Sequence, residues 1–212
     1  MLELKRPIVI LAAGDFPRHP VPLRMLAEAG TIIALDSAAD EYEAHTGKLP
    51  DLVIGDGDSI SQVLRQKLGK RFVCEAEQDT NDLCKAARYL SVKGINEATI
   101  LGATGRREDH TLGNIFHLLD LSRLLRLTMV TDYGTFYVPT ENDGVRLQVE
   151  SGAQVSVFNC GAKSLHATGL RWPLADFTEL WQGTLNEAVS SNITVEGRGN
   201  FLVYVTHHAV TR

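Results

Sequence analysis

Two aspartates separated by a single glycine follow a short apolar run early in the chain. The run Leu52–Ile54 predicts a buried strand, and Gly55 and Gly57 then permit tight or left-handed backbone that other residues resist. Asp56 and Asp58 are held close together, where their charges repel unless a proton or a cation lies between them. Hard cations such as Mg²⁺ prefer oxygen ligands of this kind. An Asp-Gly-Asp sequence is also typical of an ordinary solvated turn, so the motif alone leaves both interpretations open.

The order of apolar and glycine-punctuated segments predicts the fold that positions these aspartates. Apolar runs typical of buried strands occur at 7–13, 31–35, 52–54, 71–74, 98–101 and 127–131. Segments of helical periodicity separate them at 23–29, 37–46 and 61–68, at Leu83, Ala86, Ala87 and Leu90, and at Leu112, Phe116, Leu119 and Leu124. This alternation predicts a Rossmann-like parallel α/β domain with right-handed crossovers and helices on both faces of the sheet.

A parallel sheet of this kind brings acidic residues from several strands together. The carboxyl ends of all its strands lie on one edge, where ligands bind. Six aspartates follow strands or begin the next helix, namely Asp36, Asp56, Asp58, Asp79, Asp82 and Asp109. We expect them to converge on that edge, although aspartate is also a frequent helix cap and not all six need bind a metal.

A glycine-containing loop, Gly102–His110, is the second candidate element. It precedes a helix, so its amides and the helix N-terminus could hold an anion, with Arg106 and Arg107 beside it. His110 and Asn114 are four residues apart and share a helix face. No Walker-type Gly-x-x-x-x-Gly-Lys-Ser/Thr sequence is present. Loop arginines are often only solvated, and His110 also suits a plain helix start; beside an acid cluster, the loop indicates a metal–nucleotide complex.

The character of the sequence changes after about residue 133. Residues 144–150 alternate between apolar and polar, 201–205 form a further strand candidate, and Gly, Asn and Ser separate such short runs. This pattern predicts a smaller all-β sandwich domain. The boundary is expected near the segment Pro139–Gly144, which gives an α/β domain of residues 1–138 and a β domain of residues 139–212.

The composition is that of a globular protein without a basic footprint for nucleic acid. Of the 212 residues, 44% are hydrophobic and 22% are charged, and the net charge is −5. No apolar run approaches the length of a membrane span, and the run 8–13 is too short for a signal-peptide core. Cys74, Cys84 and Cys160 show no Cys-x-x-Cys spacing, which favours neither a disulfide framework nor a structural zinc site and indicates a reducing cytoplasm.

Several segments resemble, in the same order, signatures of the thiamine pyrophosphokinase family. The N-terminal ones are Gly55-Asp-Gly-Asp-Ser59, Gln78-Asp-Thr-Asn-Asp82, and Gly102-Ala-Thr-Gly-Arg-Arg-Glu-Asp-His110 followed by Asn114. The family's thiamine-binding region is resembled by Gly169-Leu-Arg-Trp-Pro-Leu174, Gly183 and Ser191-Asn192. The chain departs from the family pattern at Ser37-Ala38 in place of Gly-Gly, at Asn81 in place of Thr, and at Arg106 in place of Gly.

The resemblance implies a homodimeric transferase with an α/β domain and a β-sandwich domain. Family members transfer the pyrophosphoryl group of ATP to the hydroxyl of thiamine, which yields AMP and thiamine diphosphate. Each active site would combine the nucleotide and metal ligands of one subunit with part of the thiamine pocket of the other. The implied cofactor is Mg²⁺ and the implied partners are ATP, thiamine and a second copy of the chain, with no nucleic acid and no membrane.

Within this resemblance the candidate residues are assigned by their chemistry. The metal ligands are Asp36, Asp56, Asp58 and Asp82. The catalytic residues are Asp56, Asp58 and Asp82, and either of the last two would accept the proton of the attacking hydroxyl. The ATP contacts are Asp79, Gly102, Gly105, Arg107, Asp109, His110 and Asn114. The thiamine contacts are Trp172, which could stack on the pyrimidine ring, and Ser191 and Asn192.

Alternatives remain open for the tryptophans and for the activity. Trp172 beside Pro173 is, by itself, more typical of sandwich packing, and Trp181 has no motif around it and is assigned to packing. Clustered aspartates with a downstream Asp-His also suit a metal-dependent phosphoesterase. A nucleotide or thiamine sensor without turnover is a non-enzymatic alternative, although a sensor could tolerate loss of the acids that this chain retains. Analysis of reaction products separates the three.

Overall fold

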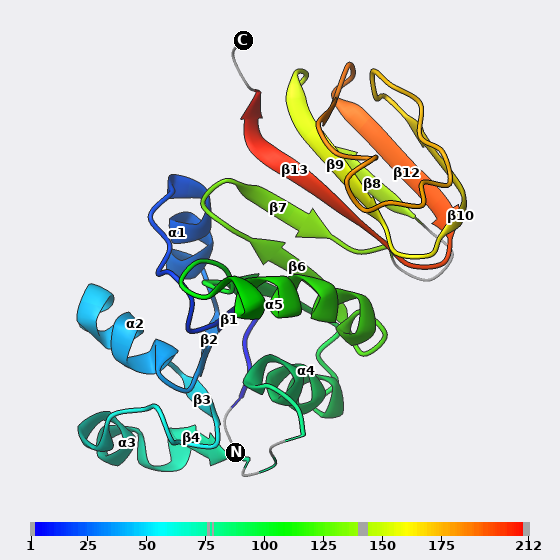
Figure 1. Ribbon diagram of the computed structural model, residues 1–212. Coiled ribbons are helices and arrows are strands. Elements are labelled where there is room, and N and C mark those ends of the chain that lie inside the picture. The colour runs from blue at the N-terminus through cyan, green and yellow to red at the C-terminus, as the bar shows by residue number, and fades with distance from the viewer. Residues whose placement is uncertain (1–2, 76, 78, 140–143, 210–212) are drawn as a thin grey trace. The chain divides into compact units, whose positions relative to one another are not determined.

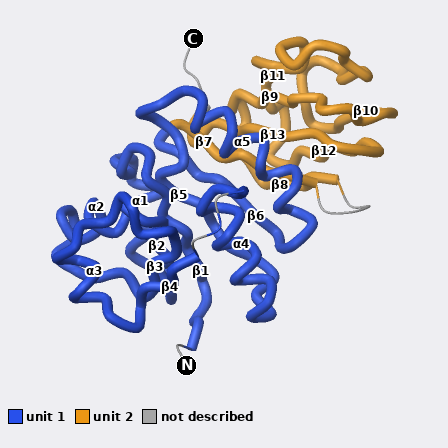
Figure 2. The backbone as a smooth tube through the Cα atoms, turned by 60° about the horizontal axis from the view of Figure 1, so that its bottom comes forward, with its two compact units in different colours: residues 1–132 blue, residues 133–212 orange. Residues whose placement is uncertain are grey.

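The computed structural model describes residues 3–75, 77, 79–139 and 144–209 (Figure 1). Gln78 of the second motif and residues 140–143 of the expected boundary segment therefore lie outside the described residues. The chain forms two compact units, Met1–Asp132 and Tyr133–Arg212 (Figure 2). This division precedes the expected one between 138 and 139, because strand β7 (Gly134–Tyr137) pairs antiparallel with β13 (Phe201–Ala209) of the second unit.

The first unit contains a parallel sheet of six strands in the order β6-β5-β1-β2-β3-β4. The strands are β1 (Ile8–Leu11), β2 (Thr31–Leu35), β3 (Leu52–Gly55), β4 (Phe72–Cys74), β5 (Glu97–Leu101) and β6 (Arg126–Val130). The helices are α1 (Pro20–Ala27), α2 (Ala38–Thr46), α3 (Gln62–Leu68), α4 (Asp82–Val92) and α5 (Glu108–Leu121), with a 3-10 turn at Gly69–Arg71. The predicted alternation of strands and helices is confirmed.

The central strands are apolar throughout because both faces of the sheet are covered. Every residue of β1, β2 and β3 is buried. On one face Val9, Ala34 and Val53 pack with residues of α1, α2 and α3 in a single core cluster. Helix α4 contacts β2, β3 and α5, and α5 contacts β6. Side chains alternate between the two faces along a strand, so covering both faces produces the continuous apolar runs seen in the sequence.

Two helices differ in detail from the sequence expectations. Helix α1 begins at Pro20, ahead of the expected Leu23, because His19 caps it by accepting a hydrogen bond from the Val21 amide (3.3 Å). Helix α5 ends at Leu121, and the residues buried along this stretch are Leu118, Leu121 and Leu125. The apolar residues that mark this helix in the sequence are not its most buried ones, since Leu112 and Leu124 are exposed and Phe116 and Leu119 are only partly buried.

The second unit is built of two antiparallel sheets, as the alternating pattern predicted. One has the strand order β11-β9-β13-β7 and the other β10-β12-β8. Their strands are β8 (Val145–Gln148), β9 (Ala153–Asn159), β10 (Lys163–Thr168), β11 (Asn186–Glu187) and β12 (Asn192–Arg198), with β7 and β13 as given above. Alternate residues of the two sheets share one core that includes Val145, Val155, Val157, Ile193 and Val203. Within the described part of the chain, no helix is long and apolar enough to cross a membrane.

Candidate active site

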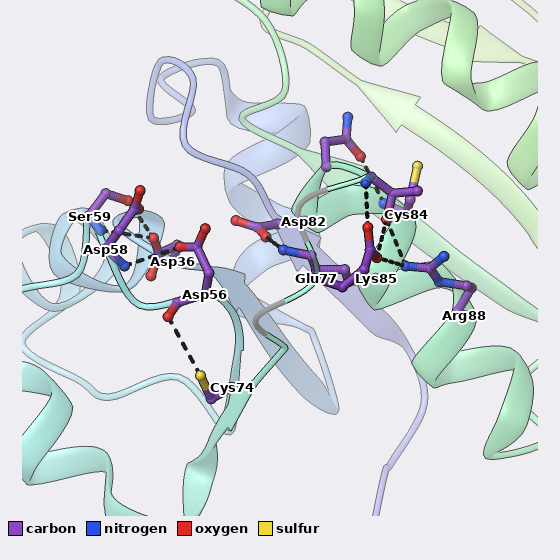
Figure 3. A network of polar contacts seen from close by, with 12 residues as sticks. Asp36, Asp56, Asp58, Ser59, Cys74, Glu77, Asp82, Cys84, Lys85 and Arg88 are labelled. Atoms are coloured by element: carbon purple, nitrogen blue, oxygen red, sulfur yellow. Dashed lines mark hydrogen bonds and ion pairs between the residues drawn. The ribbon is translucent and has the colours of Figure 1, made fainter.

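Three of the predicted aspartates meet at the carboxyl ends of two adjacent strands. Asp36 directly follows β2, and Asp56 and Asp58 follow β3. One carboxylate oxygen from each lies within 4.8 Å of the others (Figure 3). The parallel pairing of β2 with β3 causes this convergence, because it brings both strand ends to the same edge. These three residues are called the acid cluster below.

Asp36 is the buried member of the acid cluster. Its side chain is only 4% exposed, and its backbone is left-handed with φ of 42°. Its Oδ2 accepts hydrogen bonds from the Ser59 amide (3.1 Å) and the Ser59 hydroxyl (2.5 Å). Its Oδ1 is buried and has no hydrogen-bond partner among the described residues. A buried carboxylate oxygen without a hydrogen-bond partner lowers the stability of the folded protein. Left-handed backbone in a non-glycine residue is strained, and such strain is typical of functional sites.

Gly55, which precedes the Asp-Gly-Asp turn, and Gly57 within it serve two different purposes. A Cβ on Gly55 would lie 2.9 Å from Cβ of Asp36, so glycine permits the close approach of β3 to that side chain. Gly57 adopts a left-handed φ of 81°, as the sequence predicted for this turn. The Asp58 amide donates to Oδ1 of Asp56 (3.1 Å). Hydrogen bonding and charge from Asp56 raise the pKa of Asp58, because ionisation places two negative groups together.

Asp82 begins helix α4 and is paired with a buried lysine. The Asn81 side chain caps the helix by accepting from the Cys84 amide (3.0 Å). Lys85, 2% exposed, donates from Nζ to Oδ1 of Asp82 (2.9 Å; Figure 3). Burial raises the pKa of Asp82, and Lys85 opposes that rise. Burial alone would lower the pKa of Lys85, but the hydrogen bond and charge of Asp82 prevail, so its pKa is raised and the ammonium stays charged.

Sequence reasoning missed Lys85 as a candidate. It lies three residues after Asp82, the spacing at which opposite charges meet on a helix surface, and this signal could have identified the pair. The helical periodicity of this segment marks only its apolar residues, Leu83, Ala86, Ala87 and Leu90. In the structure Lys85 is a fully buried side chain.

A cavity of about 640 Å³ opens beside the acid cluster in the first unit. This volume is within the range typical of small-molecule sites. The predicted residues that line it are Asp36, Asp56, Asp79, Asp82, Gly105, Arg107, His110 and Asn114. The predicted residues outside its wall are Asp58, Gly102 and Asp109. Further lining residues that the sequence did not single out as ligands include Ser37, Ser59, Thr80, Asn81 and Lys85. Arg106, which the sequence placed beside the candidate anion-binding loop, also lines the cavity.

The loop 102–107 is held against the loop that follows β1. Backbone hydrogen bonds run from the Gly14 amide to the Gly102 carbonyl (2.7 Å) and from the Asp15 amide to the Thr104 carbonyl (2.9 Å). Gly102 and Gly105 both have left-handed backbone, with φ of 64° and 81°. The Asn114 side chain donates to the Ala103 carbonyl (2.9 Å). Gly102 and Asn114 therefore shape this loop.

Arg107 and Asp109 engage each other at the start of α5. Their side chains form a 2.6 Å ion pair, and Asp109 also accepts from the His110 amide (2.9 Å). The Arg107 hydrogen bond lowers the pKa of Asp109 to about 2. Arg106 has left-handed φ of 57° where the family pattern has glycine, and it pairs with Glu41 of α2 (2.8 Å). Both guanidinium groups are thus bound to carboxylates at the rim of the cavity.

A second polar network holds the loop that carries Asp79. Glu77 accepts from the Thr80 amide (2.6 Å), the Thr80 hydroxyl (2.8 Å) and Arg88 of α4 (2.7 Å; Figure 3). The Thr80 hydroxyl, followed by Arg88, lowers the pKa of Glu77 to about 2. This network fixes the loop to the first turns of α4, and Asp79 itself lies exposed on the cavity wall.

Both tryptophans of the second unit are exposed. Trp172 is 46% exposed, so the alternative of sandwich packing is wrong for it. Its backbone is held by two hydrogen bonds to the Asn186 side chain (3.1 and 2.8 Å), which present the ring at the surface. The packing assignment of Trp181 is also wrong, because this residue is 70% exposed and lies in the irregular segment between β10 and β11.

Ser191 and Asn192 are exposed and lie at the start of β12. A Cβ on Gly169 would lie 2.4 Å from the Asn192 carbonyl, so the segment Gly169–Leu174 begins against this pair. The Val189 amide also donates to the Gly169 carbonyl (2.9 Å). The predicted thiamine residues therefore come from two neighbouring segments of the second unit.

Comparisons with known proteins agree with both units. The family model described as "Thiamin pyrophosphokinase, catalytic domain" matches residues 23–129. A second, "Thiamin pyrophosphokinase, substrate-binding domain", matches residues 134–204. Thiamine pyrophosphokinase 1 of Oryza sativa subsp. japonica is 29% identical over 194 residues, covering 82% of this chain and 72% of the relative. Thiamine pyrophosphokinase of Bacillus subtilis (strain 168) is 28% identical over 181 residues, covering 82% and 79%.

Two solved structures of thiamine pyrophosphokinases have a fold similar to that of this chain. The crystal structure of thiamine pyrophosphokinase from Bacillus subtilis superposes with a TM-score of 0.72 at 21% identity, covering 96% of this chain and 100% of that one. The yeast thiamin pyrophosphokinase structure superposes with a TM-score of 0.76 at 16% identity, covering 95% and 86%. With matching family models on both of its units, the chain belongs to the thiamine pyrophosphokinase family.

Proposed function

We propose that the chain catalyses the thiamine pyrophosphokinase reaction with Mg²⁺-bound ATP at the cavity beside the acid cluster. The hydroxyl oxygen of thiamine attacks the β-phosphorus of ATP, and the bond from that phosphorus to the oxygen bridging it to the α-phosphorus breaks. AMP leaves, the pyrophosphoryl group is joined to thiamine, and the hydroxyl proton passes to a base. The family assignment supports this reaction, and the residues below are those that we propose perform it.

The observation that carries the metal assignment is the unpartnered, buried Oδ1 of Asp36. Asp36 belongs to a group of three carboxylates, and one oxygen of each lies within 4.8 Å of the others. Three negative groups at this distance repel one another, and oxygen donors suit Mg²⁺, so the residues present fit this cation. Asp82 would complete the set from α4. The bound cation would offset the charge of the phosphate oxygens, which is its usual contribution to phosphoryl-type transfer.

Protein groups supply the remaining chemistry. The pKa values of Asp58 and Asp82 are both raised, which makes either carboxylate a better proton acceptor for the thiamine hydroxyl. We propose that ATP is oriented by residues of the cavity wall, namely Asp79, Gly105, Arg107, His110 and Asn114. Gly102 and Asp109 would act indirectly, by shaping the loop and by holding Arg107.

Thiamine recognition is assigned to the exposed side chains of the second unit. Trp172 offers a flat aromatic face for stacking, and Ser191 and Asn192 offer hydrogen-bonding groups for a ring edge. Exposed large apolar residues of this unit also include Leu180, Trp181, Leu185 and Val189. We propose that a second copy of the chain covers these residues in a homodimer, in which each site takes part of its thiamine pocket from the other subunit.

A cytoplasmic location belongs to the same proposal. Cys74, Cys84 and Cys160 are all free thiols, which suits a reducing compartment.

The test is product analysis with Mg-ATP, with and without thiamine. Thiamine-dependent AMP, formed in equal amount with thiamine diphosphate, is the expected result. Phosphate release that does not depend on thiamine would instead favour a phosphoesterase, and ligand binding without products would favour a sensor. Mixing two inactive variants, Asp58→Asn and Trp172→Ala, should restore partial activity if sites are shared between subunits. No recovery, despite confirmed subunit exchange, would refute the shared site.

A further inference from the structure

The cavity contains a charged group that the reaction as described above does not use. Lys85 lines the cavity, and its side chain is 2% exposed, one of the largest fully buried side chains among the described residues. An ammonium group loses most of its hydration at such a position, so it must be compensated by partners. Its position in the interior of α4 fixes the backbone from which the side chain extends.

The Lys85 ammonium has more hydrogen-bond donors than it has partners among the described residues. An ammonium group carries three N–H donors. Among the described residues, Nζ has one hydrogen-bond partner, Oδ1 of Asp82 at 2.9 Å. The group is therefore anchored and oriented on one side while donor capacity remains for a ligand in the cavity.

The other strongly basic groups of the cavity wall are engaged differently. Arg106 pairs with Glu41 and its side chain is 46% exposed, and Arg107 pairs with Asp109 and is 71% exposed. Each guanidinium is solvated and bound to a carboxylate at the rim. Lys85 is the cation of this wall that is buried, in the same cavity as Asp36, Asp56 and Asp82.

We propose that Lys85 binds the polyphosphate of the nucleotide directly, donating hydrogen bonds to phosphate oxygens while Asp82 holds its ammonium in place. Phosphate oxygens are strong acceptors, and a hydrogen bond between two charged groups away from water is stronger than a neutral one. The acid cluster repels an unmetallated polyphosphate, so a fixed cation at the same cavity gives that anion a contact independent of the metal. This inference rests on the proposed function and names a further residue of the same site.

The test measures ATP binding without metal. ATP is titrated calorimetrically into the wild-type protein and Lys85→Met, both in EDTA. The expected result is an affinity for ATP lower by roughly 10- to 100-fold in Lys85→Met, the range for one charge-assisted hydrogen bond. Lys93→Met, the same change at the end of α4, is the matched control and should change affinity less than about twofold, as for a surface substitution. A role limited to folding would leave the affinity of the folded variant unchanged.

Lys85→Met leaves the Asp82 carboxylate without its partner, which destabilises the fold. A second pair of variants therefore tests the same contact if Lys85→Met does not fold. Asp82→Asn is compared with the double variant Asp82→Asn, Lys85→Met, in which no charge of the pair remains. Because EDTA removes the metal, Asp82 is not needed as a ligand, and the double variant should bind ATP roughly 10- to 100-fold more weakly than Asp82→Asn.

Two outcomes would overturn the Lys85 assignment. Equal ATP affinity within both pairs would show that the ammonium does not contact the polyphosphate. Absence of ATP binding by the wild-type protein in EDTA would also refute a metal-independent contact. Binding restored by Mg²⁺ would then leave the proposed function intact, whereas no binding with Mg²⁺ would refute the proposed function as well.

Discussion

Replacing Asp36 by Asn should stabilise the metal-free protein while abolishing its response to Mg²⁺. Asp36 is 4% exposed, and its Oδ1 lacks a hydrogen-bond partner among the described residues. An asparagine could keep one oxygen for the two Ser59 hydrogen bonds and place its amide nitrogen where Oδ1 lies. The variant thus exchanges an unsatisfied buried anion for a donor.

The size of the effect follows from the burial of that oxygen. An unsatisfied buried polar atom costs about 1–3 kcal/mol, so Asp36→Asn should increase the free energy of unfolding by about that amount in EDTA. For a chain of this length, each kcal/mol moves the unfolding midpoint by roughly 2–4 °C. Magnesium at 100 times its dissociation constant should add about 2.7 kcal/mol to the wild-type protein, and the variant should lose this gain.

Thermal and urea unfolding, each in EDTA and in Mg²⁺, measure both quantities. Asp40→Asn is the matched control, because Asp40 lies on α2, the helix that follows Asp36, and accepts from the Ser61 amide (3.0 Å) outside the acid cluster. It should give no stabilisation in EDTA and keep the Mg²⁺ response. If Asp36→Asn is destabilised in EDTA, or still gains stability from Mg²⁺ like the wild-type protein, the reasoning about the unpartnered oxygen is wrong.

Three further changes test the loop, the turn and the second unit. Gly55→Ala should lower activity at least about tenfold, because its Cβ would displace Asp36 and raise the activation free energy by more than about 1.4 kcal/mol. Gly113→Ala on α5 is the control, because open space surrounds that position, and it should leave activity unchanged. Equal effects of the two substitutions would refute the close-approach argument. The pKa of Glu77 is lowered to about 2, so the wild-type protein should have a higher free energy of unfolding than Glu77→Gln above pH 4.5, and this difference should disappear as the pH falls toward 2. Urea unfolding at both pH values measures the difference, and a difference that does not change with pH would contradict the prediction. Trp172→Ala should raise the KM for thiamine more than the KM for ATP, and should leave the melting temperature unchanged within about 2 °C because the residue is 46% exposed. Trp181→Ala is its control. An equal rise in the KM for both substrates would show that Trp172 does not take part in thiamine recognition.

Much of this architecture could be predicted from the residue pattern. Strand β2 occupies the predicted residues 31–35, because a continuous apolar run bounded by Gly30 and Asp36 fits a strand buried on both faces. The meeting of Asp36 with Asp56 and Asp58 followed from parallel pairing alone, since parallel neighbours end on the same edge. The same rule did not predict which acids line the cavity, and Asp58 and Asp109 lie outside its wall.

The sequence by itself determined the strand–helix order, the change to an all-β second unit and the aspartates at the strand ends, because these depend on local periodicity and chain direction. Tertiary structure alone decided which side chains are buried. Lys85 is buried and Trp181 is exposed, whereas the spacing of Lys85 from Asp82 and of Arg107 from Asp109 already allowed those pairs to form. Burial depends on neighbours distant in the chain and on small rotations about a helix axis, which a pattern of residue types does not encode.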